Sequence, residues 1–267
     1  MLFCIFLQQR CRKCRGTKFY APTNWRYYEQ KGLFKFYGKR VRFWYIYLNY
    51  MRIPLAKYGL RELIIFGIPC AIGIGFSIVL FPWIVPVPLF VLSFLLNFFR
   101  DPNRTTPQGY GLIIAPADGT VSHIVPVFEE NYLKCDTTKI SIFMSVMNVH
   151  VNRVPVHGRV EFIKHTKGKF LDARDDECFS SNENNIMGVS LIGSPIKIAV
   201  KQIAGKIAKR IVCACKIGDV FEQGQRFGMI KFGSRVEVFV PNSVKFEVLV
   251  MVGDKVTAGK TILGRIL

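Results

Sequence analysis

The stretch Ile217-Gly-Asp-Val-Phe-Glu-Gln-Gly-Gln225 recurs, with substitutions, as Val252-Gly-Asp-Lys-Val-Thr-Ala-Gly-Lys260. In both copies a second glycine follows the aspartate by five residues, and an apolar run comes next. Gly-Asp is typical of a tight turn, and the later glycine is typical of a left-handed backbone position. The repeat therefore predicts two similar hairpins in a β-rich fold.

Short β-type runs separated by Gly and Asp turns fill the chain from about residue 105 to its end, and few stretches there could hold a long helix. The runs are 119–127, 139–144, 156–163, 188–191, 196–203, 210–217, 235–240 and 245–251. With the repeat and Pro116-Ala-Asp-Gly-Thr-Val121, the pattern resembles the barrel-sandwich hybrid fold of lipoyl and biotinyl carriers. The lysine-centred modification turn of true carriers is missing, so the resemblance concerns the fold and not the site. We predict a mainly β (α+β) body over 105–267.

The body is preceded by an almost uncharged stretch, residues 63–99, which Pro82, Pro86 and Pro88 divide into two halves. Each half is near the lower length limit for crossing a bilayer, and the proline-rich middle is a natural turn. Basic residues flank both ends, so the positive-inside rule places both ends in the cytoplasm. We expect a membrane-associated hydrophobic helical hairpin over 51–104 that either spans the membrane or enters one leaflet, with the β-rich body on the cytoplasmic side of the inner membrane. A buried pair of core helices is the alternative.

The charge of the chain is concentrated before this hairpin. The net charge is +19, and residues 1–62 hold fourteen of the 37 Lys and Arg residues but two of the 18 Asp and Glu residues. Such a cluster beside an apolar run favours anionic lipid as the partner, and no recognised nucleic-acid motif is present, so we expect no nucleic acid. Residues 1–50 are basic and aromatic without clean periodicity. They are either a poorly ordered extension, with Met51 as an alternative start, or a surface that rests in the lipid interface.

The eight cysteines indicate a reducing compartment, because they are scattered. Cys11 and Cys14 have the spacing of half a zinc site, but no second pair follows. We therefore expect no metal.

Four histidines are candidates for acid–base chemistry: His123, His150, His157 and His165. His150 stands out because it forms an isolated polar cluster with Asn148, Asn152 and Arg153 in an apolar stretch. Buried polar groups need partners, so this cluster must meet other polar groups in the fold. The other three are more typical of strand or solvent-exposed positions.

Asp118 lies in Ala115-Pro-Ala-Asp-Gly119 and has two interpretations. Asp-Gly is a strong turn signal, so the aspartate can be a β-turn residue. It can also be the carboxylate that orients a histidine in a Ser-His-Asp arrangement. The sequence pattern leaves both open.

Five stretches, taken together and in this order, resemble the phosphatidylserine decarboxylase family in its shorter bacterial form. They are Phe98-Phe-Arg-Asp-Pro102, Ala115-Pro-Ala-Asp-Gly-Thr-Val121, Phe143-Met-Ser with Asn148-Val-His-Val-Asn-Arg-Val-Pro155, Gly168-Lys-Phe-Leu171 and Arg226-Phe-Gly-Met-Ile-Lys-Phe-Gly-Ser234. The resemblance covers about residues 98–240, is weaker in the hairpin and does not extend to residues 1–50.

The resemblance implies a proenzyme that cuts itself between Gly233 and Ser234. Ser234 would attack the carbonyl of Gly233, with His150 taking the hydroxyl proton and Asp118 holding His150. Ser234 would become a covalent pyruvoyl group, and chains 1–233 and 234–267 would stay together as a heterodimer, with a higher oligomer open. The pyruvoyl would form a Schiff base with phosphatidylserine in the membrane and yield phosphatidylethanolamine and CO2. His150 is also the candidate for protonating the resulting carbanion.

Two departures from the family's longer form stand near these residues. Arg235 follows the serine where the longer members have threonine, and Arg153 occupies the place of a second histidine. A second Gly-Ser at Gly193-Ser194 precedes a proline and lacks the surroundings of the first, so we interpret it as a turn. The alternative function is a non-enzymatic, membrane-anchored barrel-sandwich adaptor protein, which would remain one intact chain.

Overall fold

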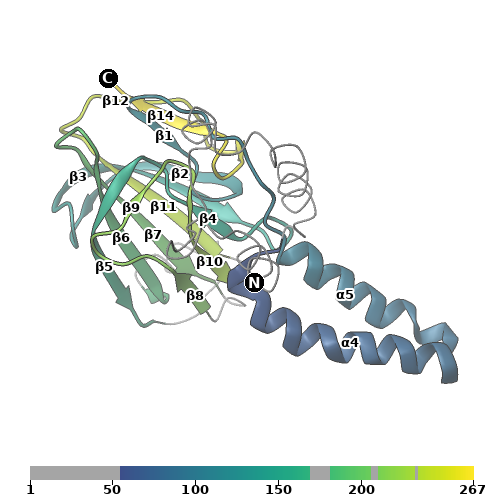
Figure 1. The fold of residues 1–267 in the computed structure, drawn as a ribbon. Coiled ribbons are helices and arrows are strands. Elements are labelled where there is room, and N and C mark those ends of the chain that lie inside the picture. Colours follow the sequence, from purple (N-terminus) through teal and green to yellow (C-terminus); the bar gives the residue numbers. More distant parts are fainter. Residues whose placement is uncertain (1–54, 169–180, 206–209, 232–233) are drawn as a thin grey trace, which may run out of the picture. The chain divides into compact units, whose positions relative to one another are not determined.

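The computed structural model describes residues 55–168, 181–205, 210–231 and 234–267 (Figure 1). The expected extension 1–50 and Gly233 lie outside the described residues. Pro54–Leu267 form one compact unit, which holds both the apolar helices and the β body.

Two apolar helices form a hairpin before the β body. The short 3₁₀ turn η1 (Lys57–Gly59) leads into α4 (Leu60–Leu80), and η2 (Pro82–Ile84) leads into α5 (Pro86–Phe98). Helix α4 ends at Leu80 because the residue before Pro82 is forced out of the helical region, and Phe81 has φ −143° and ψ 72°. Prolines at the start of α5 fit a first helical turn, whose amides need no partner within the helix.

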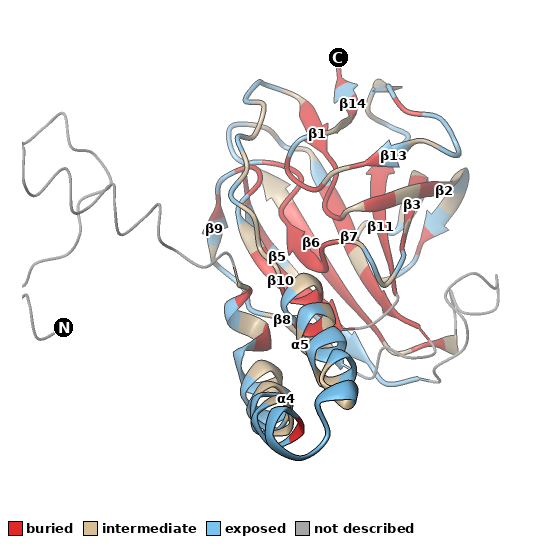
Figure 2. Cartoon of the chain, turned by 90° about the vertical axis from the view of Figure 1, so that its right-hand side faces the viewer, coloured by how far each residue is buried: buried red, intermediate tan, exposed pale blue. Residues whose placement is uncertain are grey.

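Most of the hairpin surface is apolar and exposed (Figure 2). Among the described residues, the segment Lys57–Leu80 is the one helix long and apolar enough to cross a membrane, and Pro82–Phe98 is shorter. The far end of α5 is instead buried, with Phe98 and Phe99 packed against Val151 and Met229 of the body. The hairpin therefore joins the body at one end and exposes apolar side chains along the rest of its length.

The described strands form three antiparallel sheets. The large sheet has the order β13-β2-β3-β11-β7-β6-β5-β9, and the smaller ones are β1-β14-β12 and β4-β10-β8. The strands are β1 (Leu112–Ile114), β2 (Gly119–Glu129), β3 (Cys135–Met144), β4 (Val151–Arg153), β5 (Gly158–Thr166), β6 (Asn184–Leu191), β7 (Lys197–Ala204), β8 (Arg210–Cys213), β9 (Val220–Phe221), β10 (Arg226–Lys231), β11 (Ser234–Pro241), β12 (Phe246–Val248), β13 (Lys255–Val256) and β14 (Ile262–Ile266).

Strand β11 lies in the middle of the large sheet, and all of its residues are buried. It pairs with β3 along its full length and with β7 over Ser234–Phe239. Side chains alternate between the faces, so Val236, Val238 and Val240 enter the main core, while Phe239 packs in a second cluster. The strand that begins at Ser234 is thus the central element of the body.

The two copies of the repeat form equivalent turns. The predicted left-handed position of the later glycine is confirmed, with φ 80° at Gly224 and 72° at Gly259. The first glycines are left-handed as well, with φ 96° at Gly218 and 99° at Gly253. Each turn has the same aspartate contact, in which a carboxylate accepts a backbone hydrogen bond of 2.8 Å from the residue three positions before it.

A second repeated stretch, which the structure reveals, accepts backbone hydrogen bonds from these turns. The amide of Gly224 donates to the carbonyl of Val154 at 2.8 Å, and that of Gly259 donates to Ala115 at 2.9 Å. Both receiving segments read x-Pro-x-x-Gly-x-Val, as Ala115-Pro-Ala-Asp-Gly-Thr-Val121 and Val154-Pro-Val-His-Gly-Arg-Val160. The body therefore contains two copies of one arrangement, and Asp118 occupies in one copy the place of His157 in the other.

The predicted fold class, a mainly β body preceded by an apolar helical hairpin, is confirmed. Two strands are shorter than predicted. The run 210–217 ends as a strand at Cys213 because the next residues enter the first repeat turn, and the run 245–251 is a strand only over Phe246–Val248. Apolar runs alone did not show at which residue a strand ends and a turn begins.

Two glycines give a test of this packing. A Cβ at Gly119 would lie 2.1 Å from the carbonyl oxygen of Phe143, whereas one at Gly253 would meet nothing within 4 Å but would be strained by φ 99°. We expect Gly253→Ala to cost about 1–2 kcal/mol of unfolding free energy from backbone strain, and Gly119→Ala to cost clearly more, because strands β2 and β3 must separate. Urea unfolding of the detergent-solubilised protein measures both. Equal losses would contradict the close approach of the two strands.

Candidate active site

Ser234 is the first residue of β11, and its side chain is fully buried. Its neighbours are Met144 at the end of β3 and Ala204 at the end of β7. The hydroxyl donates a hydrogen bond to Met144 Sδ at 3.3 Å. A thioether is a weak acceptor, so this contact does not hold the oxygen strongly. Gly233, the other residue of the expected scissile bond, lies outside the described residues.

His150 is fully buried at the end of the loop between β3 and β4. Its Nδ1 lies 2.9 Å from the carbonyl oxygen of Asn148. A carbonyl can only accept, so Nδ1 carries the proton and Nε2 carries the lone pair of a neutral ring. Nε2 is buried and has no hydrogen-bond partner among the residues that the structure describes. Such an unpaired buried acceptor is costly, and it marks His150 as a candidate for chemistry.

The surroundings of His150 keep it neutral. Burial lowers its pKa to about 4, Arg100 acts in the same direction, and the Asn148 hydrogen bond and the charge of Asp118 oppose it. The ring of Phe98 from α5 lies 4.3 Å from the imidazole, centroid to centroid, and shields it from water. At neutral pH the side chain is therefore an uncharged base.

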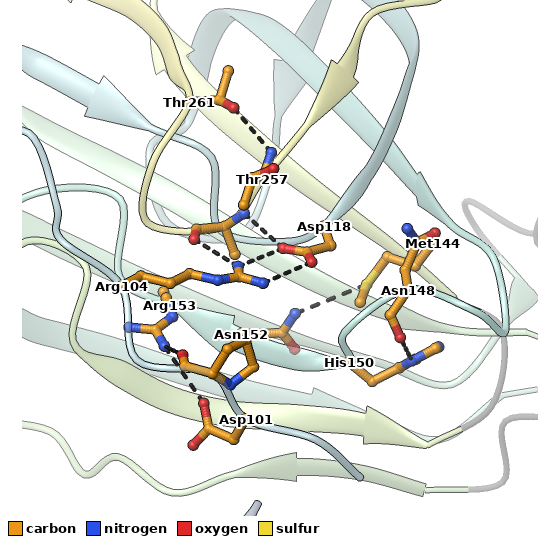
Figure 3. A network of polar contacts seen from close by, with 12 residues as sticks. Asp101, Arg104, Asp118, Met144, Asn148, His150, Asn152, Arg153, Thr257 and Thr261 are labelled. Carbon is orange, nitrogen blue, oxygen red and sulfur yellow. Dashed lines mark hydrogen bonds and ion pairs between the residues drawn. The ribbon is translucent and has the colours of Figure 1, made fainter. Parts of the chain in front are cut away.

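Asp118 lies on the turn before β2, as its Asp-Gly sequence indicated, and its carboxylate pairs with Arg104 (Figure 3). Arg104 Nη1 and Nη2 donate to the two carboxylate oxygens at 2.5 and 2.7 Å, and the amide of Ala258 donates to Oδ1 at 2.8 Å. No hydrogen bond joins Asp118 to His150 in the described part of the chain. Asp118 acts on the histidine through its charge, which raises the pKa of His150.

A second group of charges lies beside this pair. Arg153 Nη2 lies 3.4 Å from Asp101 Oδ1, and Arg226 Nε lies 2.6 Å from Asp101 Oδ2. Arg153 also donates to the carbonyl of Gly224 at 3.0 Å, inside the first repeat turn. These contacts fix the segment from Asp101 to Arg104, which connects α5 to the body. Arg153, at the place of the family's second histidine, thus binds the connection and makes no described hydrogen bond to Ser234.

A chain of buried amide side chains extends from Met144. Asn152 Nδ2 is 3.9 Å from Met144 Sδ, Gln202 Nε2 donates to Asn152 Oδ1 at 2.9 Å, and Asn185 Nδ2 donates to Gln202 Oε1 at 3.3 Å. The polar cluster around His150 was expected to meet other polar groups, and Gln202 and Asn185 are such groups. The sequence analysis did not single them out, because an isolated amide in a strand has no sequence signal.

The remaining candidates lie elsewhere. His123 is half-buried with Nδ1 3.1 Å from Ser122 Oγ, His157 is exposed, and His165 Nε2 lies 3.7 Å from a carboxylate of Glu183. At the second Gly-Ser, Gly193 has φ 78° and Ser194 Oγ accepts a hydrogen bond from the amide of Ile196. The interpretation of Gly193-Ser194 as a turn is confirmed.

These features define a class: an antiparallel β protein joined to an apolar helical hairpin, with a buried serine and a buried neutral histidine near the junction. Sequence comparison gives the family. The phosphatidylserine decarboxylase family matches residues 91–264. The chain belongs to this family.

Comparison with individual relatives gives the same family. The phosphatidylserine decarboxylase proenzyme of Syntrophus aciditrophicus is 44% identical over 210 residues, which cover 79% of this chain and 96% of the relative. That of Carboxydothermus hydrogenoformans is 41% identical over 218 residues, covering 81% and 99%. That of Geotalea uraniireducens is 48% identical over 176 residues, covering 66% and 81%. The resemblance drawn from the sequence is confirmed, as is the prediction that the chain is a decarboxylase.

The role of Asp118 can be separated from that of its arginine. Removing one partner of a mostly buried ion pair leaves the other uncompensated, so Asp118→Asn and Arg104→Gln should each cost about 3 kcal/mol of unfolding free energy. The double variant should lose less than the sum of the two. Urea unfolding of the four proteins measures this coupling. Additive losses would contradict a structural pair, and loss of self-cleavage in Asp118→Asn alone would assign Asp118 a role beyond Arg104.

The depressed pKa of His150 predicts a pH dependence of stability. Between its ordinary value of 6.5 and about 4, the unfolded chain binds a proton at His150 and the folded chain does not. The unfolding free energy should therefore fall as the pH is lowered through this window, by about 3 kcal/mol in total. His150→Gln should remove this part of the fall. Denaturant unfolding of both proteins from pH 7 to pH 4 tests it, and parallel curves would contradict a buried neutral histidine.

Proposed function

We propose that the chain converts phosphatidylserine to phosphatidylethanolamine and CO2 with a pyruvoyl group that it makes from Ser234 by cutting itself after Gly233. Two observations carry this proposal: a buried, weakly held serine hydroxyl at the first residue of the central strand, and a neutral histidine with an unpaired Nε2. No hydrogen bond joins these two side chains in the described part of the chain. Membership of the decarboxylase family and the proenzyme names of the relatives support it.

In the self-cleavage reaction the chain supplies both nucleophile and base. Nε2 of His150 takes the hydroxyl proton as Ser234 Oγ bonds to the carbonyl carbon of Gly233. The proton then passes to the nitrogen of residue 234 as the C–N bond of that peptide breaks, which leaves an ester and a free amine. The Cα proton of residue 234 is then removed and its Cβ–Oγ bond breaks, so that chain 1–233 leaves with a carboxylate end that contains Oγ, and residue 234 becomes dehydroalanine. Water replaces the nitrogen at position 234, and ammonia leaves. The neutral state of His150 suits the first step, because a protonated ring could not accept the proton.

The position of Ser234 also fits the group it would form. A pyruvoyl group there supplies a carbonyl that condenses with the substrate amine and accepts the electron pair left when CO2 departs. The substrate ammonium must first lose a proton, and Nε2 of His150 is a buried acceptor for it. Returning that proton to the carbon that lost CO2 balances the reaction, and the product amine then takes a proton from solvent. The Phe98 ring and the buried sheet exclude water around His150.

Chain 234–267 would remain bound after the cut, as a heterodimer with chain 1–233. Its strand β11 pairs on both sides with strands of the large chain, and β13 and β14 pair with β2 and β1. A break at the beginning of a central strand leaves all these ladders intact. The apolar helices would hold the body at the cytoplasmic face of the inner membrane, where the substrate lies.

Mass spectrometry under denaturing conditions tests the proposal. The purified protein should contain two chains that end at Gly233 and begin at residue 234, with a pyruvoyl in place of serine, instead of one species of 30.5 kDa. Ser234→Ala should stay intact, because it lacks the nucleophile. Ser194→Ala is the matched control, since it changes the other Gly-Ser, and it should be cut normally.

Two outcomes would overturn the proposal. A wild-type chain that stays at full length with an unmodified Ser234 would favour the adaptor function instead. Cutting that persists in Ser234→Ala would indicate an outside protease. For the mature protein, activity is measured directly as the CO2 released from dihexanoyl phosphatidylserine.

A further inference from the structure

A pocket of about 330 Å³ lies where the hairpin meets the body. Its walls come from η1 and the first turn of α4, with Tyr58, Arg61 and Glu62, and from β8 and the end of β10, with Arg210 and Lys231. This volume is at the lower end of the range of small-molecule sites, and it suits a polar headgroup. Because the exposed apolar length of α4 begins directly after Glu62, the pocket lies at the end of the hairpin that joins the body.

The pocket is positively charged. It contains Arg61, Arg210 and Lys231 against the single carboxylate of Glu62. Lys231 Nζ lies 2.6 Å from Glu62 Oε1, and both side chains are largely buried, so the lysine is held in place by this ion pair. Arg61 and Arg210 are exposed, and neither makes a hydrogen bond or ion pair to any residue that the structure describes. Two guanidinium groups are therefore available beside an anchored ammonium.

Glu62 offers a further contact. Its second oxygen, Oε2, is buried and accepts no hydrogen bond from the described residues. An unpaired buried carboxylate oxygen is costly, and a donor brought by a ligand would satisfy it. A pocket with two available cations and one unpaired acceptor fits an anionic group that also brings a hydrogen-bond donor better than a bare anion.

Strand β10 connects this pocket to the candidate active site. The amide of Ile230 donates to the carbonyl of His150 at 3.2 Å, and Lys231 is the next residue. On the other edge of the strand, Lys231 pairs with Arg210 in β8. Ser234 follows three residues after Lys231. Lys231 thus belongs to the strand that contacts the histidine, and Arg210 belongs to the strand beside it.

We propose that this pocket binds the phosphodiester of a phospholipid headgroup, with Arg61 and Arg210 contacting the phosphate oxygens and Lys231, positioned by Glu62, completing the site. The inference rests on the proposed function and names the residues that would recognise the phosphate of its substrate. Arginine suits this role because its planar donors match two phosphate oxygens at once. The phosphate would then be fixed at the membrane end of the body, and the serine part of the headgroup would extend toward residue 234.

Direct binding tests the pocket without any decarboxylation. The probe is dihexanoyl phosphatidylglycerol below its micelle concentration, because it has the phosphodiester but no amine that could react at residue 234. Calorimetry with the wild-type protein, Arg61→Gln and Arg210→Gln should show a dissociation constant that rises about tenfold or more in each variant, a loss typical of one charge-assisted contact. Arg159→Gln, which removes an exposed arginine outside the pocket, is the matched control and should bind as the wild type does.

Three results would overturn the pocket proposal: unchanged binding in both pocket variants, an equal loss in Arg159→Gln, or competition by inorganic phosphate at the same concentration as the lipid. The equal loss would indicate diffuse attraction to a basic protein, and the competition would indicate a site for free phosphate. Both pocket variants should still cut themselves fully, since neither arginine is needed for that step.

Activity separates this proposal from the proposed function. With dihexanoyl phosphatidylserine, the pocket variants should raise KM about tenfold and leave kcat within about twofold, because the phosphate contact is the same before and during the reaction. A wild-type protein that binds the lipid through these arginines but releases no CO2 would refute the function and keep the pocket. A protein that decarboxylates with unchanged KM in both variants would refute the pocket and keep the function.

Discussion

The structure depends on the pairing of β11 on both of its edges. A buried strand must satisfy its backbone amides and carbonyls through its neighbours, and β11 pairs with β3 along its full length and with β7 over Ser234–Phe239. The hydrogen-bonded ladder begins at Ser234, so the peptide bond proposed to break lies just before the first paired residue. The pairing that makes the strand central also explains how the chain could be cut there without losing its C-terminal part.

The junction between the hairpin and the body is the second feature on which the site depends. The amide of Ala56 donates to the carbonyl of Phe99 at 2.7 Å, Lys231 pairs with Glu62, and the ring of Phe98 covers His150. Desolvation by this apolar contact is the main reason that the histidine is neutral. The contacts that join the apolar hairpin to the body therefore also help to set the protonation state of the candidate base.

Asp118 had two interpretations from the sequence, a turn residue and the carboxylate that orients a histidine. The Asp-Gly sequence indicated a turn, and the residue lies on one. The carboxylate was also expected to orient a histidine, but a guanidinium group with two donors is a stronger partner for it than a buried neutral imidazole. Arg104 provides those donors from the segment that follows α5. The sequence contained no sign of this pairing, because the two residues are brought together by the path of the connecting segment.

The sequence by itself determined the local structure and the family. Proline positions divided the apolar stretch into two helices, Gly-Asp spacing located the turns of the repeat, and the five motifs in their order indicated the family. Each of these signals depends on neighbouring residues along the chain. Only the tertiary structure decided which side chains meet. The contacts of Gln202 with Asn152, of Glu62 with Lys231 and of Phe98 with His150 join residues 50, 169 and 52 positions apart, and such pairs depend on sheet order and helix docking. The tertiary structure also decides the neutral state of His150, because desolvation is a property of the packed environment and not of the residue.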